Sequence, residues 1–315
     1  MEMTILLFCI GLILIIKGGD MFVESSVNIA RATHLPEIFI GATIVSIATT
    51  TPEGIVSITA AAKGYTSMSI GNAIGSTICN TGLVLGFSNI IIPGKIKGRF
   101  FKMKSVLIIV YFIIIIILSY DGLIDISDSI ILLILLFVYI ILEGFVLKYK
   151  KNQNLKNNKM KIGLRGKFEI FLSFTIGLLG IVIGSNLLIN NGVILAEFIG
   201  VPESVISLSI IALGTSLPEL TTALTALKKG HTALSVGNVI GANILNITLV
   251  IGVSGIVNPL KVVKQNLFLD FPVSFLMILI LTIPCFLRNR ISRVQSAFLL
   301  FIYVAYITIL YRIYL

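Results

Sequence analysis

The chain has 315 residues, of which 57% are apolar and only 12% are charged, and its mean hydropathy is +1.06. These values exclude a soluble domain of this size and predict an integral membrane protein. The formal net charge of +10 would suit a nucleic-acid partner, but the placement of the basic residues, described below, excludes that class.

Ten apolar segments are close to the roughly 20 residues that a helix needs to cross a bilayer. They are predicted at about 4–27, 37–62, 67–92, 105–120, 129–147, 169–189, 204–227, 232–257, 267–286 and 293–312. Their length predicts an all-α protein, because barrel strands would be shorter and would alternate polar with apolar residues. The first segment is expected to be a retained span. A signal peptide has basic residues before its apolar segment, whereas here the segment is preceded by the acidic Glu2 and by no basic residue.

A polar stretch divides the ten predicted spans into two groups of five. The expected organisation is a first five-helix repeat at 1–147, a basic linker at 148–168 and a second repeat at 169–315. The linker is rich in Lys and Asn and has no acidic residue, so we expect a flexible connection with no room for a calcium-sensing domain. Glu24, Glu143 and Asp270 lie near the ends of spans and are expected to reach the membrane surface.

The basic residues indicate the orientation in the membrane. Most of the 24 Lys and Arg residues fall in the loops after the odd-numbered spans, while the opposite side holds the acidic loop 121–128. The positive-inside rule then predicts a multi-pass protein of the cell membrane, with both termini outside and the linker 148–168 in the cytoplasm. Because each group has an odd number of spans, the second repeat is inverted relative to the first. The basic excess is a topology signal with attraction to anionic lipid headgroups, which removes the case for nucleic acid.

Two copies of one polar motif interrupt this apolar sequence. The first reads Ala48-Thr-Thr-Thr-Pro-Glu53 and then Gly71-Asn-Ala-Ile-Gly-Ser-Thr-Ile-Cys-Asn80. The second reads Gly214-Thr-Ser-Leu-Pro-Glu219 and then Gly237-Asn-Val-Ile-Gly-Ala-Asn-Ile-Leu-Asn246. A shift of 166 residues superimposes the surrounding segments 41–86 and 207–252 without a gap. Each copy places a carboxylate at membrane depth, where an ionisable residue marks a functional site.

A proline precedes each of these carboxylates. Pro52 and Pro218 lack a backbone donor, so we expect them to break their spans and to leave carbonyl groups at 49–51 and 215–217 facing a cavity. Ser76 and Asn80 are four residues apart and share one helix face. Asn72 and Asn238 could be ligands or could join helices through hydrogen bonds; both interpretations stay open.

The donor set is entirely oxygen: carboxylates, hydroxyls, amides and backbone carbonyls. Hard cations such as calcium and sodium take these ligands, whereas zinc, copper or iron would need Cys or His. The cysteines Cys9, Cys79 and Cys285 have neither disulfide nor zinc-site spacing. Two carboxylates match the charge of one divalent cation, and several monovalent cations could replace it.

These motifs resemble the two repeats of the calcium/cation antiporter superfamily, and they are most similar to those of prokaryotic sodium/calcium exchangers. The likeness in motifs, inversion and span number extends over essentially the whole chain. The resemblance implies a central ion site formed by both repeats, with backbone carbonyls serving at Ser46, Thr49, Ala212 and Thr215. The residues matching the family's ligands are Ser46, Thr49, Thr50, Glu53, Ser76, Asn80, Ala212, Thr215, Ser216, Glu219 and Asn246.

Three positions depart from the family pattern. Thr50 replaces the usual Ser and keeps a hydroxyl. Ala242 stands where a Ser would mirror Ser76, which puts one sodium site in doubt. Asn246 stands where some members, including potassium-dependent ones, have Asp. The acidic residue of the proton-coupled branch is replaced by Gly75 and Gly241, so sodium coupling is favoured.

The expected function is therefore sodium/calcium antiport by alternating access, without a cofactor or an obligate protein partner, in contact with the lipid bilayer. The alternatives are an antiporter of the same superfamily that uses protons or carries another divalent cation, and a cation channel. An intramembrane enzyme is disfavoured, because no core histidine accompanies a nucleophile.

Overall fold

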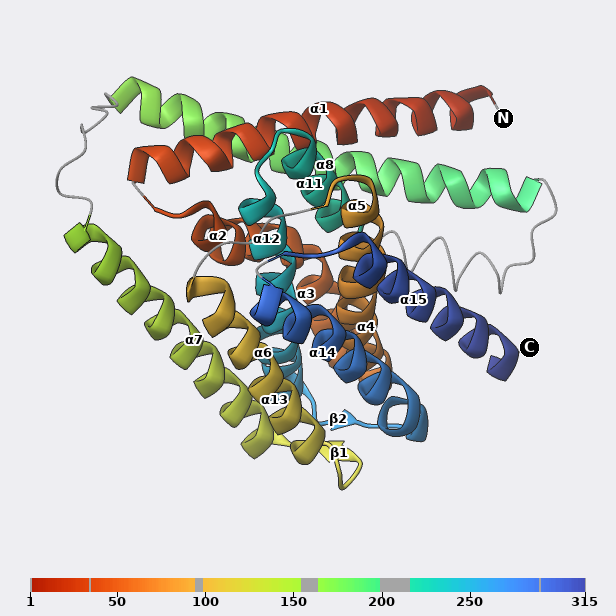
Figure 1. The fold of residues 1–315 in the computed structure, drawn as a ribbon. Helices are drawn as coiled ribbons and strands as arrows, with labels where there is room; N and C mark the ends of the chain where they lie inside the picture. The colour runs from red at the N-terminus through yellow and green to blue at the C-terminus, as the bar shows by residue number, and fades with distance from the viewer. Residues whose placement is uncertain are drawn as a thin grey trace.

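The computed structural model describes residues 2–33, 35–93, 99–153, 164–198, 216–288 and 290–314. Almost all of them are helical (Figure 1), and η denotes a π-helical turn within a span. The first half contains α1 (Glu2–Thr33), α2 (Glu37–Ile40), η1 (Gly41–Val45), α3 (Ser46–Ala62), α4 (Thr66–Cys79), η2 (Asn80–Leu85), α5 (Gly86–Ile91), α6 (Arg99–Leu118), β1 (Leu123–Ile124) and α7 (Ile126–Gln153). The second half contains α8 (Leu164–Phe198), α11 (Leu217–Lys228), α12 (Thr232–Leu245), η4 (Asn246–Val250), α13 (Ile251–Val257), β2 (Leu260–Lys261), η5 (Asn266–Asp270), α14 (Phe271–Arg288) and α15 (Arg293–Tyr314).

Nine of the ten predicted spans are found among the described residues as helices long and apolar enough to cross a membrane. They are Glu2–Thr33, Glu37–Ala62, Thr66–Ile91, Phe101–Leu118, Ile126–Phe145, Gly166–Gly192, Thr232–Val257, Asn266–Leu287 and Arg293–Leu310. Of the predicted seventh span, 204–227, the described part is α11, and residues 199–215 lie outside the described residues.

Helices enter both ends of the predicted linker 148–168, since α7 continues to Gln153 and α8 begins at Leu164; residues 154–163 lie outside the described residues. Lysine is a good helix former and its charge is favourable at a helix C-terminus, so a basic segment can extend a span. The predicted break at Pro52 is wrong, because Pro52 lies inside α3 and residues 49–51 are helical. The irregular segment is instead the π-helical turn η1, which directly precedes α3.

The sequence duplication is visible in the elements themselves. Helices in the two halves begin and end at equivalent residues, 166 positions apart. The ends at 62, 66, 79 and 80 in the first half correspond to those at 228, 232, 245 and 246 in the second. The turns between these helices each use a glycine with positive φ, Gly64 at 86° and Gly230 at 81°. Pro218 lies in the first turn of α11, where a proline is tolerated because its missing N–H would have no helical partner.

The helices α7 and α15 are also equivalent, but they are related by a shift of 167 residues, one more than the shift that relates the motifs. Both begin with the same capping arrangement. Backbone N–H groups of Asp125 and Asp128 are bound by each other's side chains, and Ser292 and Gln295 form the same reciprocal pair.

The long helices α1 and α8 lie side by side along one edge of the molecule (Figure 1). A Cβ on Gly11 would lie 2.9 Å from the carbonyl oxygen of Gly184, and one on Gly18 would lie 2.8 Å from that of Gly177. The shift of the duplication relates Gly11 to Gly177 and Gly18 to Gly184, so the two close approaches are equivalent. Small residues let two membrane helices pack backbone to backbone, as here.

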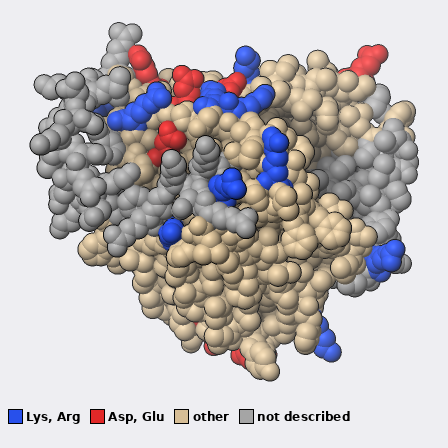
Figure 2. Space-filling view, in the orientation of Figure 1, with Lys and Arg blue, Asp and Glu red and all other residues tan. Residues whose placement is uncertain are grey.

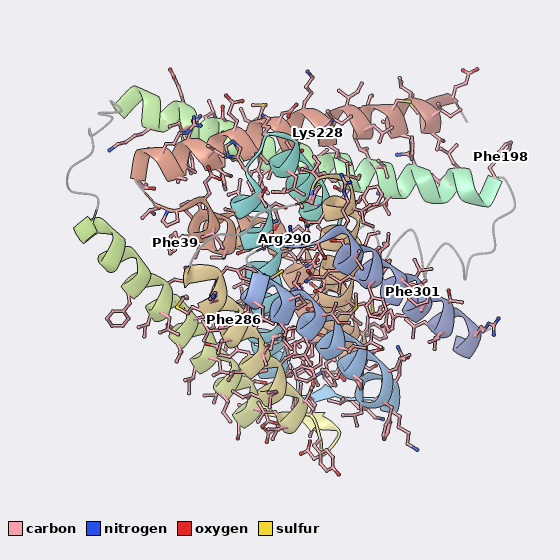
Figure 3. The ribbon with its side chains drawn as sticks, in the orientation of Figure 1. Phe39, Phe198, Lys228, Phe286, Arg290 and Phe301 are labelled. Carbon is pink, nitrogen blue, oxygen red and sulfur yellow. The ribbon has the colours of Figure 1, made fainter. Side chains whose placement is uncertain are left out.

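The polar motifs lie at the centre of the bundle, where α3, α4, α11 and α12 pack on one another. The other helices surround this centre and direct apolar side chains outward, as Phe198 and Phe301 show in Figure 3; they are 70% and 67% exposed. On the face drawn in Figure 2, most charged side chains lie in the upper half, a few lie at the right edge and at the bottom, and the broad surface between them is uncharged. A wide uncharged surface suits contact with the hydrocarbon core of a bilayer. The strands β1 and β2 pair antiparallel and join two loops on one side.

Candidate functional site

The site is organised around two carboxylates that the two halves bring together. Glu53 from α3 and Glu219 from the first turn of α11 are both fully buried. The carboxyl group of Glu53 lies close to that of Glu219 and to the hydroxyl of Ser76. The Ser216 hydroxyl donates to Glu53 Oε1 at 3.4 Å. No lysine or arginine pairs with either carboxylate among the described ion pairs, so each carboxylate is buried without a protein counter-charge in that part of the chain.

The carboxylate oxygens are short of hydrogen bonds. Glu53 Oε2 and both carboxylate oxygens of Glu219 have no hydrogen-bond partner among the described residues. The hydroxyls of Thr49 and Thr50 lie near Glu219 without completing a hydrogen bond to it. Unpaired buried carboxylates cost several kcal/mol each, so the arrangement is suited to a cation that supplies the missing charge.

Two amides complete the centre. Asn80 and Asn246 are fully buried, and neither amide group has a partner in the part of the chain that the structure describes. Each amide stands at the junction where an α-helix becomes a π-helical turn, Asn80 at the start of η2 and Asn246 at the start of η4. Single π-helical turns inside α-helices occur often at functional sites, because they redirect one side chain without ending the helix.

The structure therefore brings together most of the site residues expected from the sequence. All nine of them that the structure describes are buried, namely Ser46, Thr49, Thr50, Glu53, Ser76, Asn80, Ser216, Glu219 and Asn246. Ser216 lies at the N-terminus of α11, and Ser46 is the first residue of α3 after η1. Ala212 and Thr215 lie outside the described residues.

Among the described contacts, both motif asparagines join helices through hydrogen bonds. Asn72 Nδ2 donates to Ser57 Oγ at 2.9 Å and to the carbonyl oxygen of Glu53 at 3.2 Å, which links α4 to α3. Thr49 Oγ1 donates to Asn238 Oδ1 at 3.2 Å, which links α3 to α12. These contacts place the backbone of α3 relative to both neighbouring helices and so support the position of Glu53.

Sequence reasoning missed two buried polar residues at the centre. Asn243 Nδ2 donates to Thr81 Oγ1 at 2.9 Å, and its Oδ1 has no partner among the described residues. Thr222, one turn after Glu219, is fully buried with an unpaired hydroxyl in the described region. The available signal was the periodicity, because Asn243 and Thr222 each lie three residues from a recognised site residue on the same helix face.

The chemistry of the site is that of a hard-cation site. The donors are carboxylate, hydroxyl and amide oxygens, which calcium and sodium prefer. Within the described ranges no group of three or more His, Cys, Asp or Glu could hold a metal ion, as a transition-metal site would require. The three cysteines are free.

Comparison with known proteins agrees with this arrangement. The family model of the sodium/calcium exchanger protein matches residues 3–144 and 169–312. Sodium/calcium exchanger MaX1 of Methanosarcina acetivorans is 30% identical over 345 aligned residues, covering 98% of each chain. An uncharacterized membrane protein of Methanocaldococcus jannaschii, MJ0091, is 34% identical and covers 94% of each.

Among solved structures, the sodium-calcium exchanger NCX_Mj superimposes with a TM-score of 0.84 at 31% identity, covering 97% of this chain and 98% of that one. The predicted all-α fold of two inverted five-helix repeats is confirmed by this match. The family is one of transporters and not of enzymes. The chain belongs to the sodium/calcium exchanger family.

Proposed function

We propose that this protein exchanges sodium for calcium across the cell membrane by alternating access, with both ions binding at one central site between the two repeats. The observation that carries the proposal is the pair of buried carboxylates, Glu53 and Glu219, whose oxygens lack partners among the described residues. Each half contributes one of them, so an ion bound between them contacts both repeats at once.

The charge of the pair sets the exchange chemistry. One calcium ion neutralises two carboxylates, and sodium ions can do the same in larger number. A site left empty would hold two uncompensated charges at membrane depth, which costs several kcal/mol. The cost of moving an empty site through the membrane couples the two fluxes, because each cation must be replaced before the carrier returns.

The neutral ligands favour sodium over protons as the coupling ion. Where the proton-coupled branch of the superfamily has an acidic residue, this chain has Gly75 in the first repeat and Gly241 in the second. We propose the full ligand set as Ser46, Thr49, Thr50, Glu53, Ser76, Asn80, Ala212, Thr215, Ser216, Glu219 and Asn246. An antiporter that uses protons or another divalent cation is the second candidate, and a channel is the third.

The proposed division of the chain is a first repeat at 1–147 and a second at 169–315, with both termini outside and the intervening linker in the cytoplasm. The family match to residues 3–144 and 169–312 supports that division. The positive-inside distribution of Lys and Arg supports the orientation.

The test is calcium uptake into proteoliposomes loaded with sodium, compared with potassium, choline or an acid interior. Uptake that requires internal sodium is the expected result. Uptake driven by the acid interior would replace sodium coupling by proton coupling, and rapid flux that needs no counter-ion would indicate a channel. Absence of uptake under every gradient would rule out calcium as the substrate.

Glu53→Gln and Glu219→Gln test the site within the same assay. Each removes one charge and keeps the side-chain size, and each is expected to reduce uptake by at least about a hundredfold, since a lost charged ligand is worth about 3 kcal/mol. Glu2→Gln, at an exposed position at the start of α1, is the matched control and should behave as wild type.

A further inference from the structure

An ion pair lies buried between α6 and α7, away from the central carboxylates. Lys104 Nζ contacts Glu143 Oε1, and the two side chains are only 1% and 3% exposed. The prediction that Glu143 reaches the membrane surface is therefore wrong: its long side chain turns inward because Lys104 neutralises it. A pair this deeply buried must be well positioned, since its desolvation cost is large.

The pair is coupled to an aromatic ring. Lys104 Nζ lies 5.3 Å from the ring centroid of Tyr139, which is on α7 one turn before Glu143. A cation over an aromatic face is attracted by the ring, and the attraction is stronger in a desolvated place. The ammonium group thus holds Tyr139 from one side while Glu143 holds the ammonium group.

The hydroxyl of Tyr139 reaches the motif-bearing part of the molecule. It donates a hydrogen bond to the backbone carbonyl oxygen of Ala42, which is buried in the π-helical turn η1. That turn runs directly into Ser46, the first residue of α3, with Thr49 one turn further. Tyr139 is thus joined through η1 to the start of the helix that carries Glu53.

η1 is also packed backbone to backbone on α12. A Cβ on Gly241 would lie 2.6 Å from Ala42 Cα, and one on Gly41 would meet the main chain of α12 at 234 and 238. The turn is therefore held between α12 on one side and Tyr139 on another, with no space into which it could relax toward α12.

The second half shows why the Tyr139 hydroxyl binds η1. The duplication relates Tyr139 to Tyr306 and Lys104 to Asp270. Tyr306 donates its hydroxyl to Asp270 at 3.0 Å. A carboxylate accepts that hydrogen bond, whereas the ammonium group of Lys104 has no acceptor, so in the first half the hydroxyl must find another oxygen. Asp270 is 2% exposed, so its predicted location at the membrane surface is also wrong.

We infer that Tyr139, held in place by the Lys104–Glu143 pair, is a positioning residue that fixes η1 and thereby aligns the ion-binding groups at the start of α3. This inference rests on the proposed function. It assigns to α6 and α7 a role in ion affinity through one hydrogen bond to η1, although neither helix carries a residue of the proposed ligand set.

Tyr139→Phe removes only the hydroxyl. The expected result is a half-saturating calcium concentration raised about three- to tenfold, the effect of one lost hydrogen bond, with the maximal exchange rate unchanged. Tyr111→Phe is the matched control: Tyr111 is also buried, and its hydroxyl donates to a backbone carbonyl at 2.7 Å, but that carbonyl belongs to Leu135 on α7 and not to η1.

A double variant tests the ion pair without leaving a lone buried charge. Lys104→Met with Glu143→Leu replaces the pair by apolar side chains and is expected to fold, whereas either change alone would leave one charge unpaired. Because the Tyr139 ring loses its cation, the calcium affinity of the double variant should fall as in Tyr139→Phe. Tyr139→Phe introduced into the double variant should then change the calcium affinity by less than a further twofold.

Three outcomes would overturn the inference. Equal loss of affinity in Tyr139→Phe and Tyr111→Phe would show a general packing effect. Wild-type affinity in Tyr139→Phe, with normal exchange, would remove the positioning role and leave the proposed function intact. Failure of the wild-type protein to exchange calcium would reject the proposed function, and the inference with it.

Discussion

Asn80 and Asn246 are equivalent residues with the same unusual property, a fully buried amide without a partner in the described region. An amide oxygen in that position is a poor choice for stability and a good ligand for a cation. Replacing a buried unpaired polar group by an apolar group of similar size is neutral or stabilising.

We therefore predict that Asn80→Leu and Asn246→Leu leave the ion-free protein at least as stable as wild type and remove most of its stabilisation by calcium. Thermal unfolding in detergent, with and without calcium, measures both effects. The contrary result, a lower unfolding temperature without ions and a normal calcium shift, would assign the amides a structural role.

Ala242 has the opposite character, since it is a buried apolar residue at the position equivalent to Ser76. Ala242→Ser would add a hydroxyl, and a serine inside a helix can satisfy itself at the carbonyl one turn earlier, so the change costs little. We predict a half-saturating sodium concentration about two- to fivefold lower, from one added neutral ligand. Ala73→Ser, at another buried alanine on α4, is the control, and an equal shift there would remove Ala242 from the site.

At this scale the sequence revealed charged residues better than neutral ones. Glu53 and Glu219 stand out because a carboxylate in an apolar segment has no other explanation. Asn243 and Thr222 did not, because a neutral polar side chain inside a membrane helix is as often satisfied by its own backbone, as Thr248 is by the carbonyl of Ile244 at 2.7 Å.

The elements that shape the site are the π-helical turns. Such a turn needs no special residue, so nothing in the sequence predicts η1, η2 or η4, and the expected break at Pro52 was placed in the wrong element. In membrane helices neighbouring helices and hydroxyl side chains compensate for a proline. Here Thr51 Oγ1 donates to the carbonyl oxygen of Ile47 at 2.7 Å, next to the Ala48 carbonyl that Pro52 leaves without its helical N–H donor. The spans themselves were predictable, because their length and hydropathy follow from the bilayer.

The contact of η1 with α12 leads to a prediction about an element. A Cβ on Gly237 would lie 2.6 Å from the carbonyl oxygen of Ile38 in α2, the helix that immediately precedes η1. Gly237→Ala must push α2 and η1 away from α12, and overpacking of this kind costs about 1–3 kcal/mol.

Thermal unfolding should show that loss, and calcium affinity should fall as well because η1 moves. Gly144→Ala on α7 is the control: Gly144 is exposed, a Cβ there would meet no described atom within 4 Å, and alanine is the better helix former, so stability should stay equal or rise. Equal effects of the two substitutions would mean that the η1–α12 contact is not tightly packed.

On the scale of the whole molecule the two repeats are equivalent in fold but not in charge. Lys229, in the turn between α11 and α12, donates to the carbonyl oxygen of Asp20 at 3.0 Å and pairs with the carboxylates of Asp20 and Glu24 at 3.4 and 3.6 Å. Figure 3 marks the neighbouring Lys228 at this turn beside α1. In the next residues of the turn, His231 Nδ1 lies 3.0 Å from Glu37 Oε1 at the start of α2.

The opposite side lacks this set of charges. The duplication relates Lys229 to Lys63, but the residues equivalent to Asp20 and Glu24 are Asn186 and Asn190. Among the described residues, ion pairs of this kind are therefore found only at the end of the molecule that we propose to be cytoplasmic, where they hold α1 against the α11–α12 turn. In an alternating-access cycle such pairs favour the conformation in which that end is closed.

We predict that Lys229→Gln shifts the balance of conformations toward separation of α1 from α11. Exposed ion pairs contribute about 0.2–1 kcal/mol each, so the expected shift is about two- to fivefold. Hydrogen exchange of the amides in residues 225–235 measures it, with faster exchange in the variant at low salt. At about 1 M salt, where the Debye length is about 3 Å, the difference from wild type should disappear. Lys63→Gln, the equivalent change on the other side, should leave its own turn unchanged because asparagines replace the acidic partners there. If both variants accelerate exchange equally, the charge difference between the two repeats does not bias the molecule, and the duplication is functionally symmetric.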